Sequence, residues 1–568
     1  MLQKPEFNKQ AKEILADRYL WKDDSGKPRE TPEQMLMRVA NHVASAEKTA
    51  PLKYMWADEY YDVMAKLLFL PNSPTIMNSG RPAPHGQLAA CFVIGIEDSM
   101  ESICEAIRKQ MLIHKSGGGT GFNFSNLRGC GSKVNSTNGR ASGPISFMGL
   151  FDKATETVQQ GGMRRGANMG ILNADHPDIR DFIHCKDKDG TIANFNISVG
   201  VFDSFMEKAE ADPAGPEADL LREIADTAWR TGDPGIIFLD AINRGNTTPE
   251  LGPLTSTNPC GESPLYPNEA CNLGSLNIAK MVNRDGFDFE LLEKTAAVAT
   301  RFLDSVIDVN HYPLPEILEA VKKTRKIGLG VMGWADLLFR LRIPYDSDRA
   351  LELAEKIMST IRETAHRTSA ELGKEKGIPE ALVHLGRRNA TLTCIAPTGT
   401  IALLADCSSG IEPLFALEHT RVRTQVDGTK VVMKQVNRYY AEALKEGLGE
   451  DVIGSVFVTS HDVAPLFHVK TQAAFQKYTD LAVSKTVNLP HDSSVRDVLD
   501  SYVLAWKLGC KGITIYRDGS KSTQVLYKKE EDKNVQPKTD EMNTEGSFEK
   551  VPVAVPNIKP MKLLLKRR

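Results

Sequence analysis

Short apolar segments typical of strands alternate with amphipathic segments typical of helices over most of this chain, and this alternation constrains the fold more than any other feature. Strand-like runs lie at residues 90–96, 196–202, 236–240, 328–333, 391–396 and 455–459. Helical periodicity marks residues 99–113, 289–309, 350–372 and 495–509 between them. Strands separated by helices predict an α/β domain with much parallel strand pairing.

Three regions are predicted along the 568 residues, a length beyond what one core usually supports. Thr31, Pro32 and Gln34 predict a capped helix start, and apolar residues follow at helical spacing. Residues 1–65 are therefore expected to form a helical region. Residues 66–526 would form the catalytic domain. Residues 527–568, rich in Lys, Glu, Asn and Pro, would form a flexible tail.

Composition excludes several classes of protein. The net charge is -3 and 41% of residues are hydrophobic, which is ordinary for a soluble globular protein and indicates no nucleic-acid surface. No apolar run approaches the length of a membrane span, so a cytoplasmic location is expected. The nine cysteines include no Cys-x-x-Cys pair, and the twelve histidines lack metal-site spacing. We expect reduced thiols and no metal site built by the protein.

The segment Asn258-Pro259-Cys260-Gly261-Glu262 places one thiol between an amide and a carboxylate. If the segment is extended, all three polar side chains share one face, because strand side chains alternate. A buried structural cysteine is the simpler interpretation. Pro259 and Gly261 favour a constrained functional loop instead.

Two further glycine-containing segments leave alternatives open. Three glycines at residues 117–119 either end a helix or let the backbone lie directly against a ligand. The segment Ala396-Pro397-Thr398-Gly399-Thr400 follows a strand-like run and precedes a helix-prone one. It is either a simple turn or an anion site made of backbone amides and hydroxyl groups.

Taken together, the motifs resemble the catalytic chain of ribonucleotide reductase, in its adenosylcobalamin-dependent class II form. The resemblance runs from about Thr31 to Leu526 and rests on many collinear segments. These are Pro71-Asn72-Ser73-Pro74-Thr75, Ala89-Ala90-Cys91-Phe92, residues 117–122, residues 161–167, residues 258–262, residues 271–277 and residues 396–400.

The resemblance implies a fold and a set of catalytic residues. The fold is a ten-stranded α/β barrel, in which two sets of five parallel strands run antiparallel to each other around an internal finger loop. Cys260 at the loop tip would become a thiyl radical, Glu262 would act as the base and Asn258 would hold substrate hydroxyls. Cys91 and Cys271 would converge below the ribose and end as a disulfide, which requires close α-carbons.

The resemblance also implies binding residues. Contacts to the substrate nucleotide are expected from Thr75, Ala90, Gly119, Ala396, Pro397, Thr398, Gly399 and Thr400. A deoxynucleotide effector at the interface of a homodimer is expected near Asp98, Ser99, Met100, Lys115 and Arg128. Residues 161–168 match the loop that relays effector identity to the substrate site.

Class II is favoured because class I chains carry two adjacent tyrosines where this chain has Ile515-Tyr516, and no glycyl-radical segment of class III follows.

The expected activity is adenosylcobalamin-dependent reduction of ribonucleotides, with diphosphates as the expected substrate. The alternatives are a class I large subunit that needs a metal-containing partner, and a non-catalytic nucleotide-binding paralogue. Class II chains usually end in a tail with a cysteine pair that reduces the active-site disulfide, whereas the last cysteine here is Cys510. Either that tail was removed from this sequence, or an external dithiol, a thioredoxin-like protein or a separate tail chain is expected to reduce the cysteine pair.

Overall fold

The computed structural model describes residues 3–81, 86–134, 138–158, 166–188, 190–424 and 430–520. The expected tail at 527–568 and most of the loop at 161–168 therefore lie outside the described residues. Within the described part of the chain, no helix is both long enough and apolar enough to cross a membrane.

Five parallel strands form the first half of the barrel. In spatial order they are β2 (Cys91–Val93), β3 (Gly119–Asn123), β6 (Asn168–Asn173), β7 (Phe195–Val201) and β8 (Gly235–Phe238). Each neighbouring pair is parallel, with registers such as Cys91 opposite Gly119 and Ser198 opposite Gly235. Parallel neighbours need crossover connections, and helices supply most of these here.

The second half repeats this arrangement in the opposite direction. It contains β11 (Ala270–Asn277), β14 (Ile327–Met332), β17 (Thr486–Leu489) and β18 (Gly512–Arg517). The segment at 391–395 lies between β14 and β17, joined by parallel bridges from Thr393 to Leu329 and from Ile395 to Val483. Antiparallel pairing of β2 with β11 and of β8 with β18 joins the two halves. The predicted ten-stranded barrel is confirmed.

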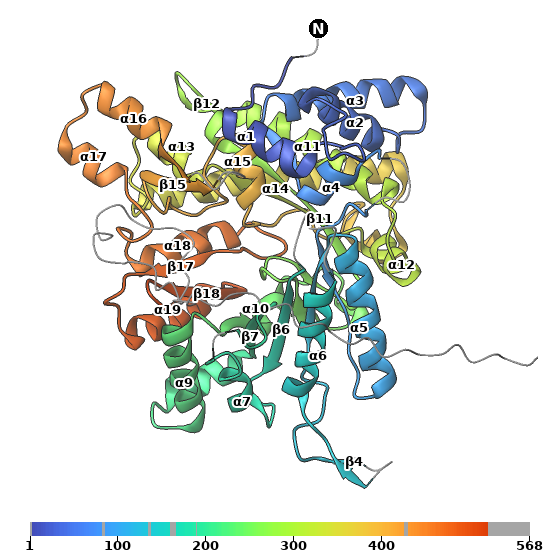
Figure 1. The fold of residues 1–568 in the computed structure, drawn as a ribbon, viewed down its shortest axis with the longest axis vertical. Helices are drawn as coiled ribbons and strands as arrows, with labels where there is room; N and C mark the ends of the chain where they lie inside the picture. Colours follow the sequence, from blue (N-terminus) through green and yellow to red (C-terminus); the bar gives the residue numbers. More distant parts are fainter. Residues whose placement is uncertain are drawn as a thin grey trace, which may run out of the picture. The chain divides into compact units, whose positions relative to one another are not determined.

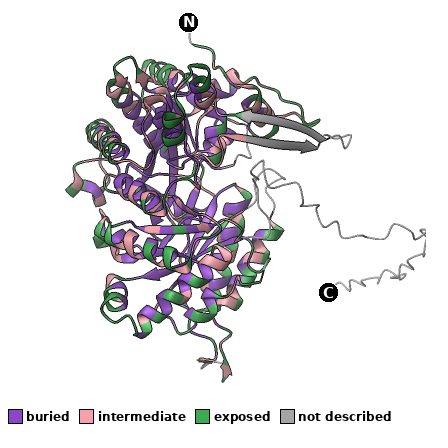
Figure 2. Cartoon of the chain, turned by 90° about the vertical axis from the view of Figure 1, so that its left-hand side faces the viewer, coloured by how far each residue is buried: buried purple, intermediate pink, exposed green. Residues whose placement is uncertain are grey.

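Helices surround the strands (Figure 1). Those of the first half are α5 (Met100–Lys115), α6 (Pro144–Thr157), α7 (Ile179–Ile183), α8 (Asp203–Ala211), α9 (Pro216–Thr231) and α10 (Leu239–Arg244). Those of the second half are α11 (Phe289–Val309), α12 (Pro315–Thr324), α13 (Trp334–Leu341), α14 (Asp348–Lys376), α15 (Gly399–Ala405), α16 (Arg438–Lys445), α17 (Glu450–Val456), α18 (Pro465–Gln476) and α19 (Val495–Lys507). Burial is concentrated on the strands and on the inner helix faces (Figure 2).

The expected N-terminal helices are present. They are α1 (Lys9–Ile14), the π-helical turn η1 (Leu15–Tyr19), α2 (Pro32–Ala44), α3 (Ala50–Ala65) and, after strand β1 (Phe69–Pro71), α4 (Ser73–Asn78). The predicted capping box is confirmed, because Thr31 Oγ1 accepts from Gln34 N and Gln34 Oε1 accepts from Thr31 N. Strand β1 pairs antiparallel with β11 and so attaches this region to the barrel.

Small two-stranded ribbons and 3-10 turns complete the structure. The ribbons are β4 (Lys133–Val134) with β5 (Gly139–Arg140), β9 (Ser256–Thr257) with β10 (Pro264–Leu265), β12 (Val282–Asn283) with β13 (Gly286–Phe287), and β15 (Glu418–Thr424) with β16 (Lys430–Val436). The turns are η2 (Pro249–Leu251), η3 (Ile278–Lys280) and η4 (Glu380–Leu385).

One predicted strand is wrong. Residues 455–459 form no strand: α17 ends at Val456, and Thr459 makes a single bridge to Leu414. Val456 and Phe457 are buried in a small cluster with Phe339 and Tyr439. Packing of this apolar run against α13 and α16 overrides its intrinsic preference for a strand.

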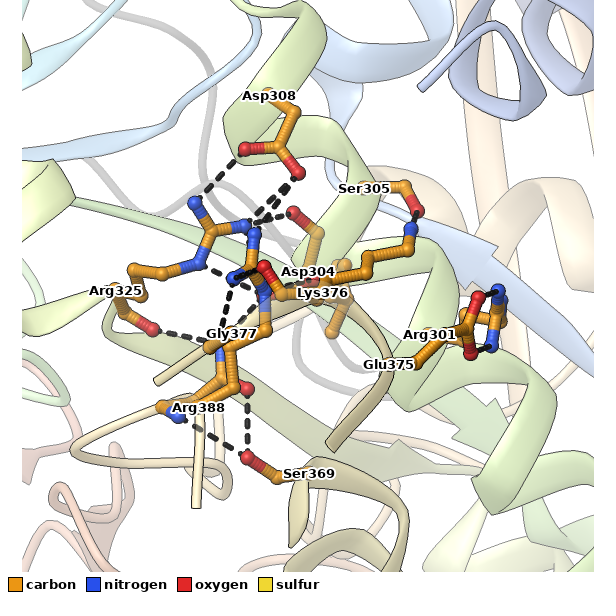
Figure 3. Close-up of polar contacts among 12 residues, drawn as sticks. Arg301, Asp304, Ser305, Asp308, Arg325, Ser369, Glu375, Lys376, Gly377 and Arg388 are labelled. Carbon is orange, nitrogen blue, oxygen red and sulfur yellow. Dashed lines mark hydrogen bonds and ion pairs between the residues drawn. The ribbon is translucent and has the colours of Figure 1, made fainter. Parts of the chain in front are cut away.

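A set of ion pairs with a buried centre and exposed carboxylates at its edge, here called the α11 ion network, fixes helix α11 inside the structure (Figure 3). Four carboxylates face four cations: Glu47, Asp304, Asp308 and Glu375 against Arg301, Arg325, Lys376 and Arg388. Arg301 reaches Glu47, in the turn after α2, at 2.7 Å, and Arg325 reaches Asp304 at 2.8 Å. The network therefore connects the N-terminal helices, α11 and α14.

Candidate active site

The predicted finger loop is the ribbon of β9 and β10, and its tip is a tight turn. Asn258 N donates to Ser263 O at 3.2 Å and Gly261 N donates to Asn258 O at 3.1 Å. Gly261 has a φ of +81°, which favours glycine. The extended conformation considered for residues 258–262 is therefore wrong, because a turn, not strand alternation, brings their polar side chains together.

Glycines on β3 make room for the finger loop inside the barrel. A Cβ atom on Gly121 would lie 1.6 Å from Thr257 O, and one on Gly119 would lie 2.8 Å from Pro259 Cγ. Helix α5 ends at Lys115, so the glycine run both follows a helix end and permits a close backbone approach. That approach is by the chain's own loop.

The side chains at the loop tip surround Cys91. Asn258 Oδ1 accepts from Ser263 N at 2.9 Å, which orients the amide so that its Nδ2 donates to Cys91 Sγ at 3.1 Å. Cys91 Sγ in turn lies 3.9 Å from Glu262 Oε1. Asn258 and Glu262 are buried, whereas Cys260 is exposed. One thiol is therefore accessible at the tip and another lies beside an amide and a carboxylate.

Cys91 and Cys271 lie directly opposite each other on β2 and β11. Opposed residues in antiparallel strands have α-carbons about 4.5–5.5 Å apart, within the range that a disulfide spans. Both thiols are reduced and buried. Burial raises the pKa of Cys91 well above its ordinary value, and Glu262 adds to this; burial likewise raises the pKa of Cys271. Both groups therefore stay protonated at neutral pH.

A cavity of about 330 Å³ opens above these thiols. Its walls include Ala90, Cys91, Gly119, Asn258, Cys260, Glu262, Ala396, Pro397, Thr398, Gly399 and Thr400, all predicted from the sequence. Thr398 has a φ of +56°, an uncommon conformation for a β-branched residue and one that is frequent at functional sites. Thr75 does not line the cavity. Its hydroxyl donates to Oδ1 of Asn72, which does line it, at 2.9 Å.

Sequence reasoning missed several residues of this cavity. Arg18 and Tyr19 reach it from η1, and Asn72 and Ser73 reach it from the start of α4. Asn72 and Ser73 lie in the segment Pro71–Thr75, for which the family resemblance implies a substrate contact from Thr75 only. No local pattern around Arg18 indicates a binding role.

A second cavity of about 270 Å³ lies on the other side of Cys260. It is lined by β7, β8 and β18, with the polar side chains of Asn196, Ser198 and Thr514 beside the apolar Ile237 and Ile513. At one wall, Glu412 accepts from Thr486 N at 2.7 Å and forms an ion pair with the buried Lys485. Cys260 thus borders two cavities.

The expected effector residues gather only in part. Asp98, Ser99, Met100 and Arg128 line a surface cavity of about 470 Å³, where Arg128 Nε lies 2.6 Å from Asp98 Oδ2. Lys115 does not line it, because it ends the 16-residue helix that Met100 begins. Across the described residues there is no group of three or more side chains suited to a metal ion.

Comparison with known proteins gives consistent matches over most of the chain. The family described as "Ribonucleotide reductase, barrel domain" matches residues 89–216, 214–383 and 377–516, and "Ribonucleotide reductase, all-alpha domain" matches residues 5–84. The vitamin B12-dependent ribonucleoside-diphosphate reductase of Thermoplasma acidophilum is 42% identical, over 92% of this chain and 81% of that protein. The protein of that name from Mycobacterium tuberculosis is 43% identical, over 90% of this chain and 80% of its own length.

A solved structure shares the fold. The Actinobacillus ureae class Id ribonucleotide reductase alpha subunit superposes with a TM-score of 0.76, covering 90% of this chain and 97% of that one. At 24% sequence identity, this likeness concerns the fold alone.

Proposed function

The chain belongs to the ribonucleotide reductase family, and we propose that it reduces ribonucleoside diphosphates to 2'-deoxyribonucleotides with adenosylcobalamin as cofactor. One observation carries the proposal: Cys91 and Cys271 face each other across β2 and β11, directly below the cavity that Cys260 enters. The names of the similar proteins support the diphosphate substrate and the cofactor.

Cys260 would start the reaction on the substrate. As a thiyl radical it would abstract the ribose 3'-hydrogen atom, and it would return that atom at the end. Its accessible position at the tip of the finger loop suits this role, because it borders the cavity above the thiol pair. The neighbouring Glu262 would accept the proton of the 3'-hydroxyl, and Asn258 would hold substrate hydroxyls through its amide.

The cysteine pair would supply the two electrons. The 2'-hydroxyl leaves as water, the carbon–oxygen bond is replaced by a carbon–hydrogen bond, and two thiols become one disulfide. Cys91 lines the cavity and Cys271 does not, so Cys91 would give its proton to the leaving hydroxyl. The raised pKa of Cys91 keeps that proton in place at neutral pH. An external dithiol, a thioredoxin-like protein or a separate tail chain would restore the thiols.

The remaining wall of the cavity suits the nucleotide. The amides and hydroxyl groups of residues 398–400 would bind the diphosphate, while Ala90 and Gly119 would contact the nucleoside; Thr75 would act through Asn72. Asp98, Ser99, Met100 and Arg128 would bind a deoxynucleotide effector at the interface of a homodimer, and Lys115 would contribute from the far end of α5. A cytoplasmic location would fit this role.

The second cavity fits the cofactor's nucleoside part. The hydroxyl groups of Ser198 and Thr514 can donate and accept hydrogen bonds there, and Asn196 can accept through its Oδ1 while its Nδ2 donates to Pro259 O at 2.8 Å. The cavity borders Cys260 without overlapping the thiol pair. When bound, adenosylcobalamin would supply the radical chemistry that converts the Cys260 thiol to a thiyl radical.

The proposal is tested by an anaerobic assay with adenosylcobalamin, dithiothreitol and either the diphosphate or the triphosphate of one ribonucleoside. We expect deoxynucleotide from the diphosphate with no second protein. Product only after addition of a metal-containing subunit would indicate a class I enzyme. Nucleotide binding without product under either condition would indicate a non-catalytic paralogue.

A further inference from the structure

One cation borders the cavity above the thiol pair, and it comes from outside the barrel. Among the described residues that line this cavity, Arg18 is the only one with a cationic side chain. Glu262 is the only anionic one. A ribonucleoside diphosphate is a polyanion, so a guanidinium at the cavity wall is the side chain best suited to pair with it.

The guanidinium of Arg18 is available to a ligand. Its side chain is 55% exposed, and its ion pair is with the adjacent Asp17, where Nε lies 3.5 Å from Oδ2. That contact uses the Nε edge and leaves the two terminal nitrogens for another group. Two parallel N–H groups match two oxygens of a phosphate.

The π-helical turn η1 that carries Arg18 is held in place on two sides. Tyr19 is buried, and its hydroxyl lies 2.7 Å from Ser73 Oγ at the start of α4. Asn8, which caps the preceding α1, donates from Nδ2 to Asp406 Oδ1 at 2.8 Å, just beyond the end of α15. The turn that carries Arg18 thus lies between the start of α4 and the C-terminal end of α15, the helix that residues 399 and 400 begin.

A second donor lies on the same wall. Asn72 is 8% exposed and lines the cavity, and its Oδ1 accepts from Thr75 N at 3.0 Å. With Oδ1 committed to capping α4, the Nδ2 group is left as the free end of the amide. Within the described part of the chain, Asn72 Nδ2 has no hydrogen-bond partner. A buried donor without a partner is costly, so a phosphate oxygen that reached Asn72 Nδ2 from the cavity would be bound favourably.

We propose that Arg18 binds the terminal phosphate of the substrate and that Asn72 donates to the same diphosphate. The nucleotide is then held between the N-terminal helical region and the turn at residues 398–400. This inference rests on the proposed function, because it takes the substrate to be a ribonucleoside diphosphate. It assigns a binding role to the helical region, which the sequence motifs left without one.

The test is equilibrium binding by calorimetry of cytidine diphosphate, cytidine monophosphate and cytidine to the full chain. Arg18→Ala is expected to weaken binding of the diphosphate about tenfold or more, because a charge-assisted contact is lost. Binding of the monophosphate should change by less than about twofold, since it lacks the terminal phosphate. Arg18→Lys should lie between wild type and Arg18→Ala, because lysine keeps the charge and loses the paired geometry.

Two further variants control for charge and folding. Lys12→Ala removes a cation from the neighbouring α1, outside the cavity, and should bind all three ligands as wild type does. Asn72→Asp keeps the oxygen that caps α4 but replaces the donor by an anion. We therefore expect it to weaken diphosphate binding while the melting temperature stays close to that of wild type.

Two outcomes would overturn the assignment of Arg18. One is unchanged diphosphate binding in Arg18→Ala, and the other is an equal loss for all three ligands, which would mean that Arg18 shapes the cavity without contacting phosphate. A wild-type chain that binds none of the three would overturn the proposed function as well. If Arg18→Ala binds nucleotide and forms product as wild type does, the assignment of Arg18 fails while the proposed function stands.

Discussion

The α11 ion network and the cavity above the thiol pair both hold buried polar groups within the same chain, yet these groups are matched differently. In the network, four carboxylates face four cations at short distances, and Asp304 and Asp308 each contact both Arg325 and Arg388. In the cavity, Arg18 and Glu262 are the only charged side chains among the described residues of the wall. Thiols, amides, hydroxyl groups and apolar side chains such as Met77 and Leu273 form the rest of the wall.

Ionisation shows what this difference means. Burial alone would raise the pKa of Asp304, but Arg325 and Arg388 outweigh it and hold the pKa below its usual value. Among the described residues no comparable cation faces Cys91, so burial raises its pKa and the thiol stays neutral. Charges that satisfy one another fix the fold, whereas neutral thiols with their protons in place are suited to chemistry.

The largest expected effect is in the cavity. Cys260→Ala should reduce product to the background level, because no other described thiol borders both cavities. Nucleotide affinity and melting temperature should stay close to wild type, since this side chain is exposed. Activity and binding are measured on the same preparation, with the exposed Cys130→Ala as the control. Detectable deoxynucleotide from Cys260→Ala would remove the assigned role.

Loss of the base should have a smaller effect. Glu262→Gln keeps the shape of the side chain, and we expect the turnover number to fall about 10²–10⁴-fold, the usual contribution of a general base. The turnover number is measured at saturating substrate. Glu250→Gln, an exposed residue ahead of the finger loop, is the matched control. Equal turnover in the two variants would mean that Glu262 is structural.

In the network, the expected loss is of stability. Asp304→Ala leaves two buried guanidinium groups with one carboxylate fewer, so the free energy of unfolding should fall by about 3–5 kcal/mol. Lys294→Ala breaks an exposed ion pair on the same helix and should leave the free energy close to that of wild type. Both are measured by denaturant unfolding. If Asp304→Ala keeps the free energy of unfolding of wild type but loses turnover, the network would not be a purely stabilising region.

The pH dependence of thiol labelling should show the smallest effect. An ordinary thiol reacts with iodoacetamide at a rate that levels off above a pKa of about 8.5, whereas a raised pKa moves that plateau to higher pH. For Cys91 and Cys271 we expect slow labelling that still rises through pH 9, read by peptide mass spectrometry. A plateau near pH 8.5 for either residue would show that burial has not raised its pKa.

Much of the fold could be predicted because local signals agreed with tertiary packing. Residues 289–309 were expected as a helix and form α11 with the same bounds, since Asp288 caps its start and one face is apolar. The segment at 455–459 misled because Val456 and Phe457 pack against helices distant in sequence. Residues 391–396 join the barrel through single bridges, which no local pattern distinguishes from a full strand.

The site divides in the same way. The segments at 258–262 and 396–400 could be found because each gathers several functional residue types within five positions. Arg18 and Tyr19 could not be found, because a π-helical turn about 240 residues before Cys260 reaches the cavity only through tertiary packing. The pairing of Cys91 with Cys271 came from family resemblance; the strand register gives its physical basis.

The most direct test of the central claim is to count thiols in a single turnover. Reduced protein is mixed anaerobically with adenosylcobalamin and a ribonucleoside diphosphate, without external dithiol, and disulfides are mapped by mass spectrometry. We predict one disulfide between Cys91 and Cys271 for each deoxynucleotide formed, and none in a parallel sample that lacks nucleotide. Product formed while both thiols remain reduced, or normal product yield from Cys271→Ser, would contradict the account.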